Sequence, residues 1–174
     1  LIDIPSSGFI EFNEKKIDTN SSIQNDYVRS KNIGIIYQDK NLLPDFTALE
    51  NVLLPNLLIS NNKSKSTELA KKLIKKFDLT SRLNHYPSEL SGGENQRIAI
   101  ARALINEPNI ILADEPTGSL DFDNAKQIFK ILFNLKEKKR IIIFATHNRY
   151  FANMADCKIK MISGKMNITN ERIS

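Results

Sequence analysis

Two adjacent carboxylates that follow a short apolar run are the residues of this chain best suited to phosphate chemistry. Ile110-Ile-Leu-Ala113 is continuously apolar, as expected of a parallel strand buried on both faces, and Asp114 and Glu115 follow it directly. Ligands of open α/β sheets bind at the carboxyl ends of such strands. Asp114 can hold Mg²⁺, which prefers oxygen ligands, and Glu115 can polarise a water aimed at a terminal phosphate. A solvated loop beginning at the strand end also explains the pair.

A second candidate lies in Leu90-Ser-Gly-Gly-Glu-Asn-Gln-Arg97. Ser91 and Glu94 have the spacing of a capping box, in which each side chain accepts a hydrogen bond from the other residue's backbone N–H, so a helix begins here. Gly92 and Gly93 fall in its first turn, where each glycine costs about 1 kcal/mol relative to alanine, and this indicates close approach by another group. The positive end of a helix attracts anions such as phosphate. Phosphate binding and ordinary helix capping both explain the motif.

The elements that must position these residues alternate between strands and helices, which predicts an α/β fold. The predicted strands are Gly8–Phe12, in a small antiparallel section, then Ile33–Tyr37, Asn109–Ala113 and Ile141–Ala145, with a closing hairpin through Gly164. Residues 41–90 are predicted to be helical, with a Thr47–Glu50 capping box, Pro55 ending or kinking a helix and a polar linker over 60–66. Two more helices are predicted: one from Ser91 to before Pro108, with the apolar stripe Ile98, Ala101, Leu104 and Ile105, and one near Asp123–Lys138.

Composition and cysteine usage narrow the class of protein. The 174 residues, 41% of them hydrophobic, suffice for a single domain with a core. No apolar run approaches the roughly 18 residues that a membrane-spanning helix needs, and no secretory signal is visible. Cys157 is the single cysteine, so an internal disulfide is excluded and a reducing compartment fits. Its alternation with Ile159 and Met161 predicts a buried strand thiol rather than a reactive one.

The net charge of +5 raises the question of a nucleic-acid partner, but the clusters of basic residues argue against one. Each cluster is predicted to lie on the solvated face or at the negative end of an amphipathic helix, where nearby anionic lipid headgroups would also be tolerated. The first cluster is Lys71, Lys72, Lys75 and Lys76, opposite Leu69, Leu73, Ile74 and Phe77; the second is Lys136, Lys138, Lys139 and Arg140.

Taken in order, the motifs resemble those of the ATP-binding cassette (ABC) ATPases. Leu90–Arg97 is similar to the signature motif of that family, and Ile110–Glu115 to its Walker B strand with the catalytic glutamate. Ser119-Leu-Asp121 resembles the D-loop, Gln38 the glutamine of the Q-loop, and His147 the switch histidine. The resemblance implies a P-loop NTPase-like core with a helical subdomain at about 41–90 and a small antiparallel section, together forming one domain over residues 1–174.

Two segments narrow the resemblance to small transporter ATPases of the lipoprotein-releasing and macrolide-export type. They are Asn41-Leu-Leu-Pro-Asp-Phe-Thr-Ala-Leu-Glu-Asn-Val52 and Ala113-Asp-Glu-Pro-Thr-Gly118. This resemblance implies an ATP-hydrolysing subunit that energises lipoprotein release from the bacterial inner membrane. Its expected partners are membrane permease subunits and a second ATPase subunit. Contact with the membrane would then be indirect, from the cytoplasmic face.

The resemblance also implies a role for each motif residue, with ATP and Mg²⁺ as cofactors. Two cassettes are expected to sandwich two ATP molecules head to tail, so that the signature residues of one chain meet nucleotide held by the other. The implied nucleotide-binding residues are Ser91, Gly92, Gly93 and Glu94, with Asp121 as a link across the dimer. The implied catalytic residues are Glu115 as general base, His147 as the γ-phosphate contact and Gln38 as a sensor of Mg²⁺ and water; Asp114 and Gln38 are the implied metal contacts.

One family motif has no counterpart in this sequence. The phosphate-cradling loop G-x-x-x-x-G-K-[ST] is absent, and Leu1-Ile-Asp-Ile-Pro-Ser-Ser-Gly8 resembles the segment that comes after that loop and its helix. The sequence is therefore expected to be a fragment without its Walker A segment. A soluble ABC ATPase of the DNA-repair or translation type and an inactive truncated product remain as alternatives. Against the repair type, Gln38 and Ser91 are joined by a compact segment without sustained heptads, where a long coiled coil would be expected.

A coupling role is a further hypothesis for the start of the helical section. Gln38 lies where the core meets that section, so its rearrangement with the γ-phosphate would reorient the segment that begins there. Some of the apolar residues in this segment could receive a short helix from a membrane subunit, or all of them could fill the core of the subdomain. They are Phe46, Leu49, Val52, Leu53 and Leu57.

Overall fold

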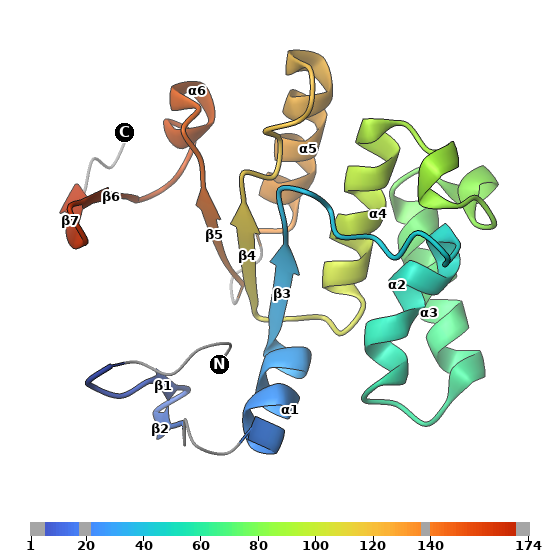
Figure 1. Ribbon diagram of the computed structural model, residues 1–174, viewed down its shortest axis with the longest axis horizontal. Coiled ribbons are helices and arrows are strands. Elements are labelled where there is room, and N and C mark those ends of the chain that lie inside the picture. Colours follow the sequence, from blue (N-terminus) through green and yellow to red (C-terminus); the bar gives the residue numbers. More distant parts are fainter. Residues whose placement is uncertain (1–5, 18–21, 137–139, 170–174) are drawn as a thin grey trace.

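The computed structural model describes residues 6–17, 22–136 and 140–169, and a three-stranded parallel sheet lies at its centre (Figure 1). The strands are β3 (Ile33–Ile36), β4 (Ile110–Asp114) and β5 (Ile141–Ala145), in the order β3-β4-β5. Ile33 is in register with Ile110, and Ile110 with Ile141, so the carboxyl ends of all three strands lie at one edge of the sheet. The α/β prediction is confirmed.

Because the strands are parallel, helices carry the chain from the end of one strand back to the start of the next. Helix α4 (Gly92–Leu104) leads to β4, and α5 (Phe122–Asn134) connects β4 to β5. Both helices begin at the end of the molecule where the strands finish (Figure 1). The predicted apolar stripe of α4 is confirmed, because Ile98, Ala101, Leu104 and Ile105 are all buried. Gly34 in β3 allows α4 to approach closely, since a Cβ there would lie 2.5 Å from the carbonyl oxygen of Ala103.

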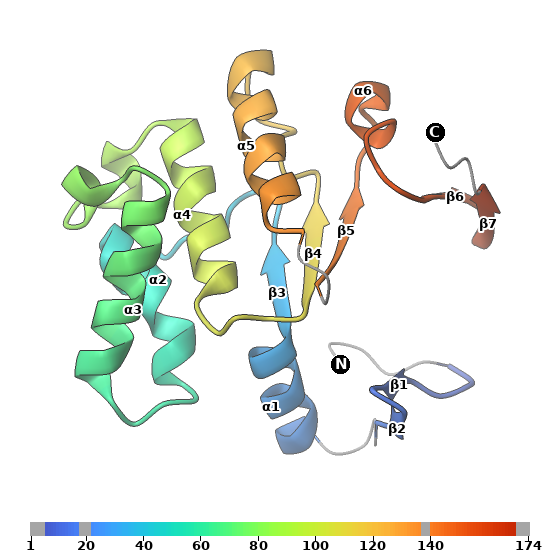
Figure 2. The ribbon, with the colours of Figure 1, turned by 180° about the vertical axis from the view of Figure 1, so that it is seen from behind.

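The helical section lies beside the sheet and contains α2 (Ala48–Leu57), α3 (Lys63–Lys76) and the short 3₁₀ helices η1 (Thr80–Arg82) and η2 (Pro87–Glu89) (Figure 2). Its predicted Thr47 capping box is present. Pro55 lies inside α2, and the helix ends at Leu57. The polar linker is shorter than predicted, because the side chain of Asn62 accepts a hydrogen bond from the backbone N–H of Lys65 and so starts α3 within it.

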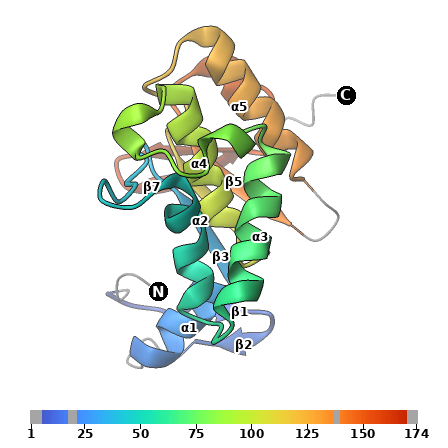
Figure 3. The same cartoon turned by 90° about the vertical axis from the view of Figure 1, so that its right-hand side faces the viewer.

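The side-chain amides of Asn56, which is buried, and of Asn106, which is half-buried, link helices of the protein. Nδ2 of Asn56 donates to Oδ1 of Asn106 at 2.8 Å, and the Ser66 hydroxyl donates to Oδ1 of Asn56 at 2.6 Å. Nδ2 of Asn106 donates to the carbonyls of Ser30 and Pro55 at 2.9 and 3.2 Å. Ser30 belongs to α1 (Ser22–Asn32), so one network ties α1, α2 and α3 to the segment that follows α4. Figure 3 shows α1 below the helical section.

The two interpretations of the apolar residues near the start of this section can now be separated. Val52 and Leu53 are buried in the main core, so the core-packing interpretation is right for them. Leu49 and Leu57 are half-buried against the same core, and Phe46 is 38% exposed. The lysine faces of α3 are solvated as predicted: Lys71, Lys72, Lys75 and Lys76 are exposed, and Ile74 and Phe77 are buried.

Helix α5 is shorter than its predicted range. It ends at Asn134 with Leu135 as its cap, and Lys136 forms an ion pair with Asp156 at 2.7 Å. Arg140 lies near the end of α5 as predicted, since its guanidinium donates to the carbonyl of Leu135 at 3.3 Å. Lys138 and Lys139 lie outside the described residues.

Two small antiparallel pairs lie apart from the main sheet. Strand β1 (Glu11–Phe12) pairs with β2 (Lys15–Lys16), which confirms the small antiparallel section. The predicted hairpin is β6 (Lys158–Ile162) with β7 (Lys165–Thr169), turning at Ser163 and Gly164.

The prediction of a buried Cys157 is wrong. Cys157 is exposed and precedes β6 rather than lying within it. Ile159 and Met161, which share its alternation, are 53% and 64% exposed. An alternating pattern gives a buried face only where another layer covers it, and no described element covers this one. Among the described residues, no helix has the length and apolar character needed to cross a membrane.

Candidate active site

The turn after β4 carries the two predicted carboxylates. Asp114 is the last residue of the strand, and its side chain is exposed at the sheet edge. Glu115 adopts a left-handed backbone conformation with φ of 40°, which costs a non-glycine residue on the order of 1 kcal/mol. Its N–H still donates to the carbonyl of Ala145 at 3.0 Å, so the neighbouring strand holds the strained residue in place.

The carboxylate of Glu115 is held by the residues that follow β5. Oε1 accepts a hydrogen bond from the backbone N–H of His147 at 2.7 Å, and the same oxygen lies 2.7 Å from Nδ1 of the His147 ring. The Thr146 hydroxyl donates to Oε2 at 3.2 Å. The side chain of Glu115 is 17% exposed, and that of His147 is 84% exposed. With Nδ1 directed at Glu115, Nε2 is the histidine nitrogen that can meet a ligand.

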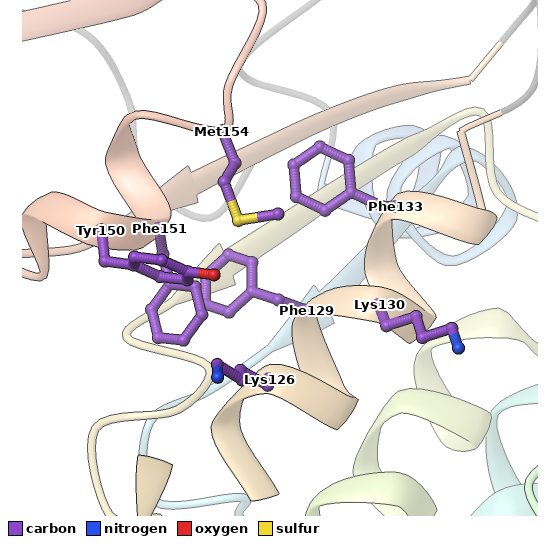
Figure 4. Close-up of a pocket in the computed structure, with 7 residues that line it drawn as sticks. All are labelled: Lys126, Phe129, Lys130, Phe133, Tyr150, Phe151 and Met154. Carbon is purple, nitrogen blue, oxygen red and sulfur yellow. The ribbon is translucent and has the colours of Figure 1, made fainter. Parts of the chain in front are cut away.

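An aromatic cluster fixes the chain just beyond His147. Helix α6 (Arg149–Ala152) begins at an Asn148 cap, and its buried Phe151 stacks on Phe129 of α5 with ring centroids 3.8 Å apart. Figure 4 shows these two rings close together among the side chains that line a hollow; the others are Lys126, Lys130, Phe133, Tyr150 and Met154. Anchoring of α6 on α5 therefore holds the His147 segment against the end of β4.

Gln38 reaches the same strand end from β3. Gln38 and Asp39 are the central residues of a turn that is closed by a hydrogen bond from the N–H of Lys40 to the carbonyl of Tyr37, at 3.3 Å. The side chain of Gln38 is exposed, and its Nε2 lies 3.5 Å from where a Cβ on Gly118 would be. Gly118 thus leaves room for the glutamine beside the turn after β4.

Two basic residues that sequence reasoning missed hold this turn. Nζ of Lys40 donates to the Ser119 hydroxyl at 2.7 Å. The guanidinium of Arg102 donates to the carbonyls of Lys40 and Asn41 at 2.6 and 2.5 Å. Both contacts join residues far apart in the sequence, so no local spacing reveals them. The available signal was Arg102 itself, a charged residue between Ala101 and Ala103 on the apolar helix α4.

The signature motif forms the predicted helix start. Ser91 is the N-cap of α4; its hydroxyl accepts from the N–H of Glu94 at 3.3 Å, and Glu94 accepts from the N–H of Ser91 at 2.8 Å. Arg82 also binds the Glu94 carboxylate, at 2.9 Å. The hydrogen bond with Arg82, followed by those with Ser91, lowers the pKa of Glu94 to about 2. Glu94 therefore shapes the helix start, while Ser91 and Gly92 are exposed.

The close approach predicted at the glycine pair is present at Gly93. A Cβ on Gly93 would lie 3.0 Å from Oδ1 of Asn124, whereas one on Gly92 would lie 3.5 Å from Leu120, an ordinary contact. Asn124 is held by Asp121, the N-cap of α5. Oδ1 of Asp121 accepts from the backbone N–H of Asn124 at 3.0 Å, and Oδ2 of Asp121 accepts from Nδ2 of Asn124 at 2.6 Å. These bonds, the backbone one first, lower the pKa of Asp121.

The structure thus places the predicted residues in two neighbouring groups. Gln38, Asp114, Glu115 and His147 gather at the carboxyl ends of the strands, and Ser91–Glu94 form the start of α4. The segment 118–124 touches both groups, through Gly118 and Ser119 on one side and Leu120 and Asn124 on the other.

Comparison with known proteins identifies the family. The family model described as ABC transporter matches residues 2–118. The chain belongs to the ABC transporter family.

Proteins similar in sequence match nearly the whole chain. The lipoprotein-releasing system ATP-binding protein LolD of Wigglesworthia glossinidia brevipalpis is 45% identical, and the match covers 95% of this chain and 72% of that protein. LolD of Cytophaga hutchinsonii is 40% identical over 94% of this chain and 75% of its own length. These matches confirm the predicted resemblance to the lipoprotein-releasing type.

Solved structures confirm the predicted ABC ATPase fold. A dimeric structure of the ATP-binding cassette MJ0796 bound to ADP and Pi is similar with a TM-score of 0.83 and 32% identity, covering 95% of this chain and 75% of that one. A second dimeric structure of this bacterial ABC transporter cassette has the same TM-score and 33% identity. Membership of this family makes the chain an ATPase component that binds nucleotide.

Proposed function

We propose that this chain is the ATP-hydrolysing subunit that energises release of lipoproteins from the bacterial inner membrane, working on its cytoplasmic face through membrane permease subunits. The observation that carries the chemistry is the Glu115 carboxylate at the end of β4, held by the backbone N–H of His147 and adjacent to Asp114. The lipoprotein cargo is supported by similarity to LolD from several bacteria, at 40–46% identity.

Glu115 is proposed as the general base. The N–H of His147 and the hydroxyl of Thr146 fix the orientation of its two oxygens, so that the carboxylate does not have to be ordered during the reaction. A carboxylate fixed in this way can accept the proton of a water that attacks the γ-phosphate. His147, bound to Glu115 through Nδ1, presents Nε2 toward the solvent side, where a phosphate oxygen can be met.

The residues also fit a Mg²⁺ ion held jointly with nucleotide. Mg²⁺ binds through one or two carboxylates together with phosphates and waters, rather than in a cage of protein ligands. Asp114 is an exposed carboxylate at the strand end, and Gln38 offers an amide oxygen from the end of β3. Among the described residues, no group of three or more His, Cys, Asp or Glu side chains could hold a metal by itself. When bound, the ion would neutralise charge on the phosphates, and Asp114 and Gln38 would position it.

The signature turn is proposed to act on the nucleotide of a second subunit. Ser91 and Gly92 are exposed at the positive end of α4, where the helix can receive an anion from outside the chain. The carboxylate of Glu94 is engaged by Arg82 and Ser91, so its proposed contribution is to hold this helix start in shape. The similar cassette MJ0796 is dimeric, which supports pairing with a second subunit; the head-to-tail orientation is part of the proposal.

A complementation experiment tests the cargo. A bacterium depleted of its own lipoprotein-releasing ATPase would receive the full gene for this protein with the genes of its membrane partners, and lipoprotein release from spheroplasts would be measured. Wild-type protein should restore release, Glu115→Gln should not, and Glu68→Gln on the exposed face of α3 should behave as wild type. ATP hydrolysis by the assembled complex without any release of lipoprotein would overturn the proposed cargo.

A further inference from the structure

The turn that carries Gln38 has an unfavourable backbone for its sequence. Lys40 and Asn41 are both left-handed, with φ of 58° and 45°, and neither is glycine. The N–H of Asn41 donates to the carbonyl of Asp39 at 2.6 Å, which tightens the turn further. Non-glycine residues keep such conformations only where the surrounding structure holds them.

Arg102 supplies that support from α4. Its two terminal nitrogens donate to consecutive carbonyls, those of Lys40 and Asn41, at 2.6 and 2.5 Å. Charge-assisted, two-pronged bonds of this kind depend on the planar guanidinium, and a lysine ammonium does not reproduce them. Arg102 therefore fixes the two residues whose conformations close the Gln38 turn.

The same turn contacts the segment between the two groups of site residues. Nζ of Lys40 bonds to the Ser119 hydroxyl, and Nε2 of Gln38 lies beside Gly118. At its other end, α4 begins with Ser91 and the glycine pair, about 16 Å from Arg102 at the rise of an α-helix. One rigid helix thus carries the signature turn at its start and the support of the Gln38 turn near its end.

We propose that Arg102 is a positioning residue that sets the location of Gln38 according to the position of helix α4. A displacement of the signature turn moves α4, and the guanidinium transmits that movement to the carbonyls of Lys40 and Asn41 and so to Gln38. The inference rests on the proposed function, because it gives Gln38 its role in hydrolysis.

The test is a double-mutant cycle in the assembled transporter. Arg102→Lys should lower kcat for ATP on the order of tenfold, with KM changed by less than about twofold, because Arg102 contacts backbone carbonyls of the turn and is not itself among the proposed nucleotide contacts. In a Gln38→Ala background, Arg102→Lys should change kcat by less than about twofold, since its effect passes through Gln38. Asn41→Gly, which removes the cost of the left-handed residue, should restore part of the kcat lost in Arg102→Lys.

Arg140→Lys is a matched control. The Arg140 guanidinium also donates to two backbone carbonyls, of Pro108 at 3.0 Å and Leu135 at 3.3 Å, but far from the Gln38 turn. Its kcat should stay near that of wild type. Equal losses in Arg140→Lys and Arg102→Lys, additive effects of Arg102→Lys and Gln38→Ala, or a parallel loss of Tm and kcat without rescue by Asn41→Gly would each overturn the proposal.

Failure of the proposed function gives a different pattern. If Glu115→Gln hydrolyses ATP like wild type, the assigned mechanism is wrong whatever the cycle shows. If Glu115→Gln is inactive and the cycle is additive, the mechanism stands and the positioning role of Arg102 is wrong.

Discussion

The signature turn and the end of β4 both depend on a glutamate that accepts a backbone N–H, yet the two regions differ in how far that bond reaches. Glu94 binds the N–H of Ser91, three residues away, while Glu115 binds the N–H of His147, 32 residues away. Glu94 is also paired with a permanent cation, Arg82, whereas the other partners of Glu115 are a hydroxyl and an imidazole. The first arrangement holds a charged side chain that shapes a helix start; the second aligns the carboxylate that we propose as the general base.

The largest effect is expected from removing the base. Glu115→Gln keeps the size of the side chain and can still accept from the N–H of His147, so nucleotide affinity should change by less than about twofold, while kcat should fall by about 10²–10⁴-fold. ATPase assays and nucleotide binding on the assembled complex measure both quantities. Glu94→Gln should leave hydrolysis far more active, and equal losses in the two variants would erase the distinction between the two regions.

A smaller but still large loss is expected from Ser91→Arg. A bulky cation at the exposed start of α4 should block pairing with a second subunit and lower ATPase activity by at least about tenfold, with nucleotide affinity of the single subunit nearly intact. Mixing Ser91→Arg with Glu115→Gln chains gives heterodimers in which one shared site carries both lesions and the other none. Recovery of activity in the mixture supports the shared site.

Loss of nucleotide affinity in the isolated Ser91→Arg subunit would instead place Ser91 in its own chain's site. Ser91→Thr is the control for capping, because its hydroxyl can still accept from the N–H of Glu94.

The Glu94 pair should appear in the pH dependence of stability. Its pKa is lowered from 4.5 to about 2, so the stabilisation is fully present above pH 4.5 and is lost as the pH falls toward 2. Glu94→Gln should lower the free energy of unfolding near neutral pH by about 1–2 kcal/mol, a modest value because water screens the 40%-exposed Arg82. Denaturant unfolding at a series of pH values measures this. Unchanged acid sensitivity in Glu94→Gln would contradict the assignment.

The smallest effect is expected from Thr146→Val. The substitution keeps the shape of the side chain and removes the hydroxyl that donates to Glu115 at 3.2 Å and accepts from the N–H of Asn148 at 3.1 Å. Only the first bond touches the carboxylate, so kcat should fall by about two- to tenfold. Thr67→Val on α3, where the hydroxyl donates to the carbonyl of Lys63, is the matched control. A kcat equal to wild type would show that the two contacts from His147 suffice to orient the carboxylate.

Contacts between residues close in the sequence were predicted correctly, whereas contacts between distant residues were predicted only in part. The capping boxes at Thr47 and Ser91 were predicted because their partners lie three residues away. The order of the motifs predicted that Glu115 and His147 belong to one site, but their hydrogen bond depends on the pairing of β4 with β5. The support of the Gln38 turn by Arg102 was missed for the same reason.

Predictions were less accurate where the outcome depends on which other elements pack against a segment. Cys157 was expected to be buried because alternation in β6 is typical of a half-buried strand, yet burial depends on a covering layer that periodicity does not report. Pro55 was expected to end or kink its helix, and α2 does end two residues after it, at Leu57, so for this residue the local pattern placed the helix end closely.

The register of Ile33 with Ile110 has a consequence for the order in which the protein is made. On the ribosome, β3 emerges long before its partner, and the whole helical section is synthesised in between. The helical section, which closes mostly local contacts, can collapse first, while β3 waits as an unpaired strand until β4 appears. In the folded protein α4 packs against both α2 and β3, so helices that fold first would shorten the loop that pairing of β3 with β4 has to close.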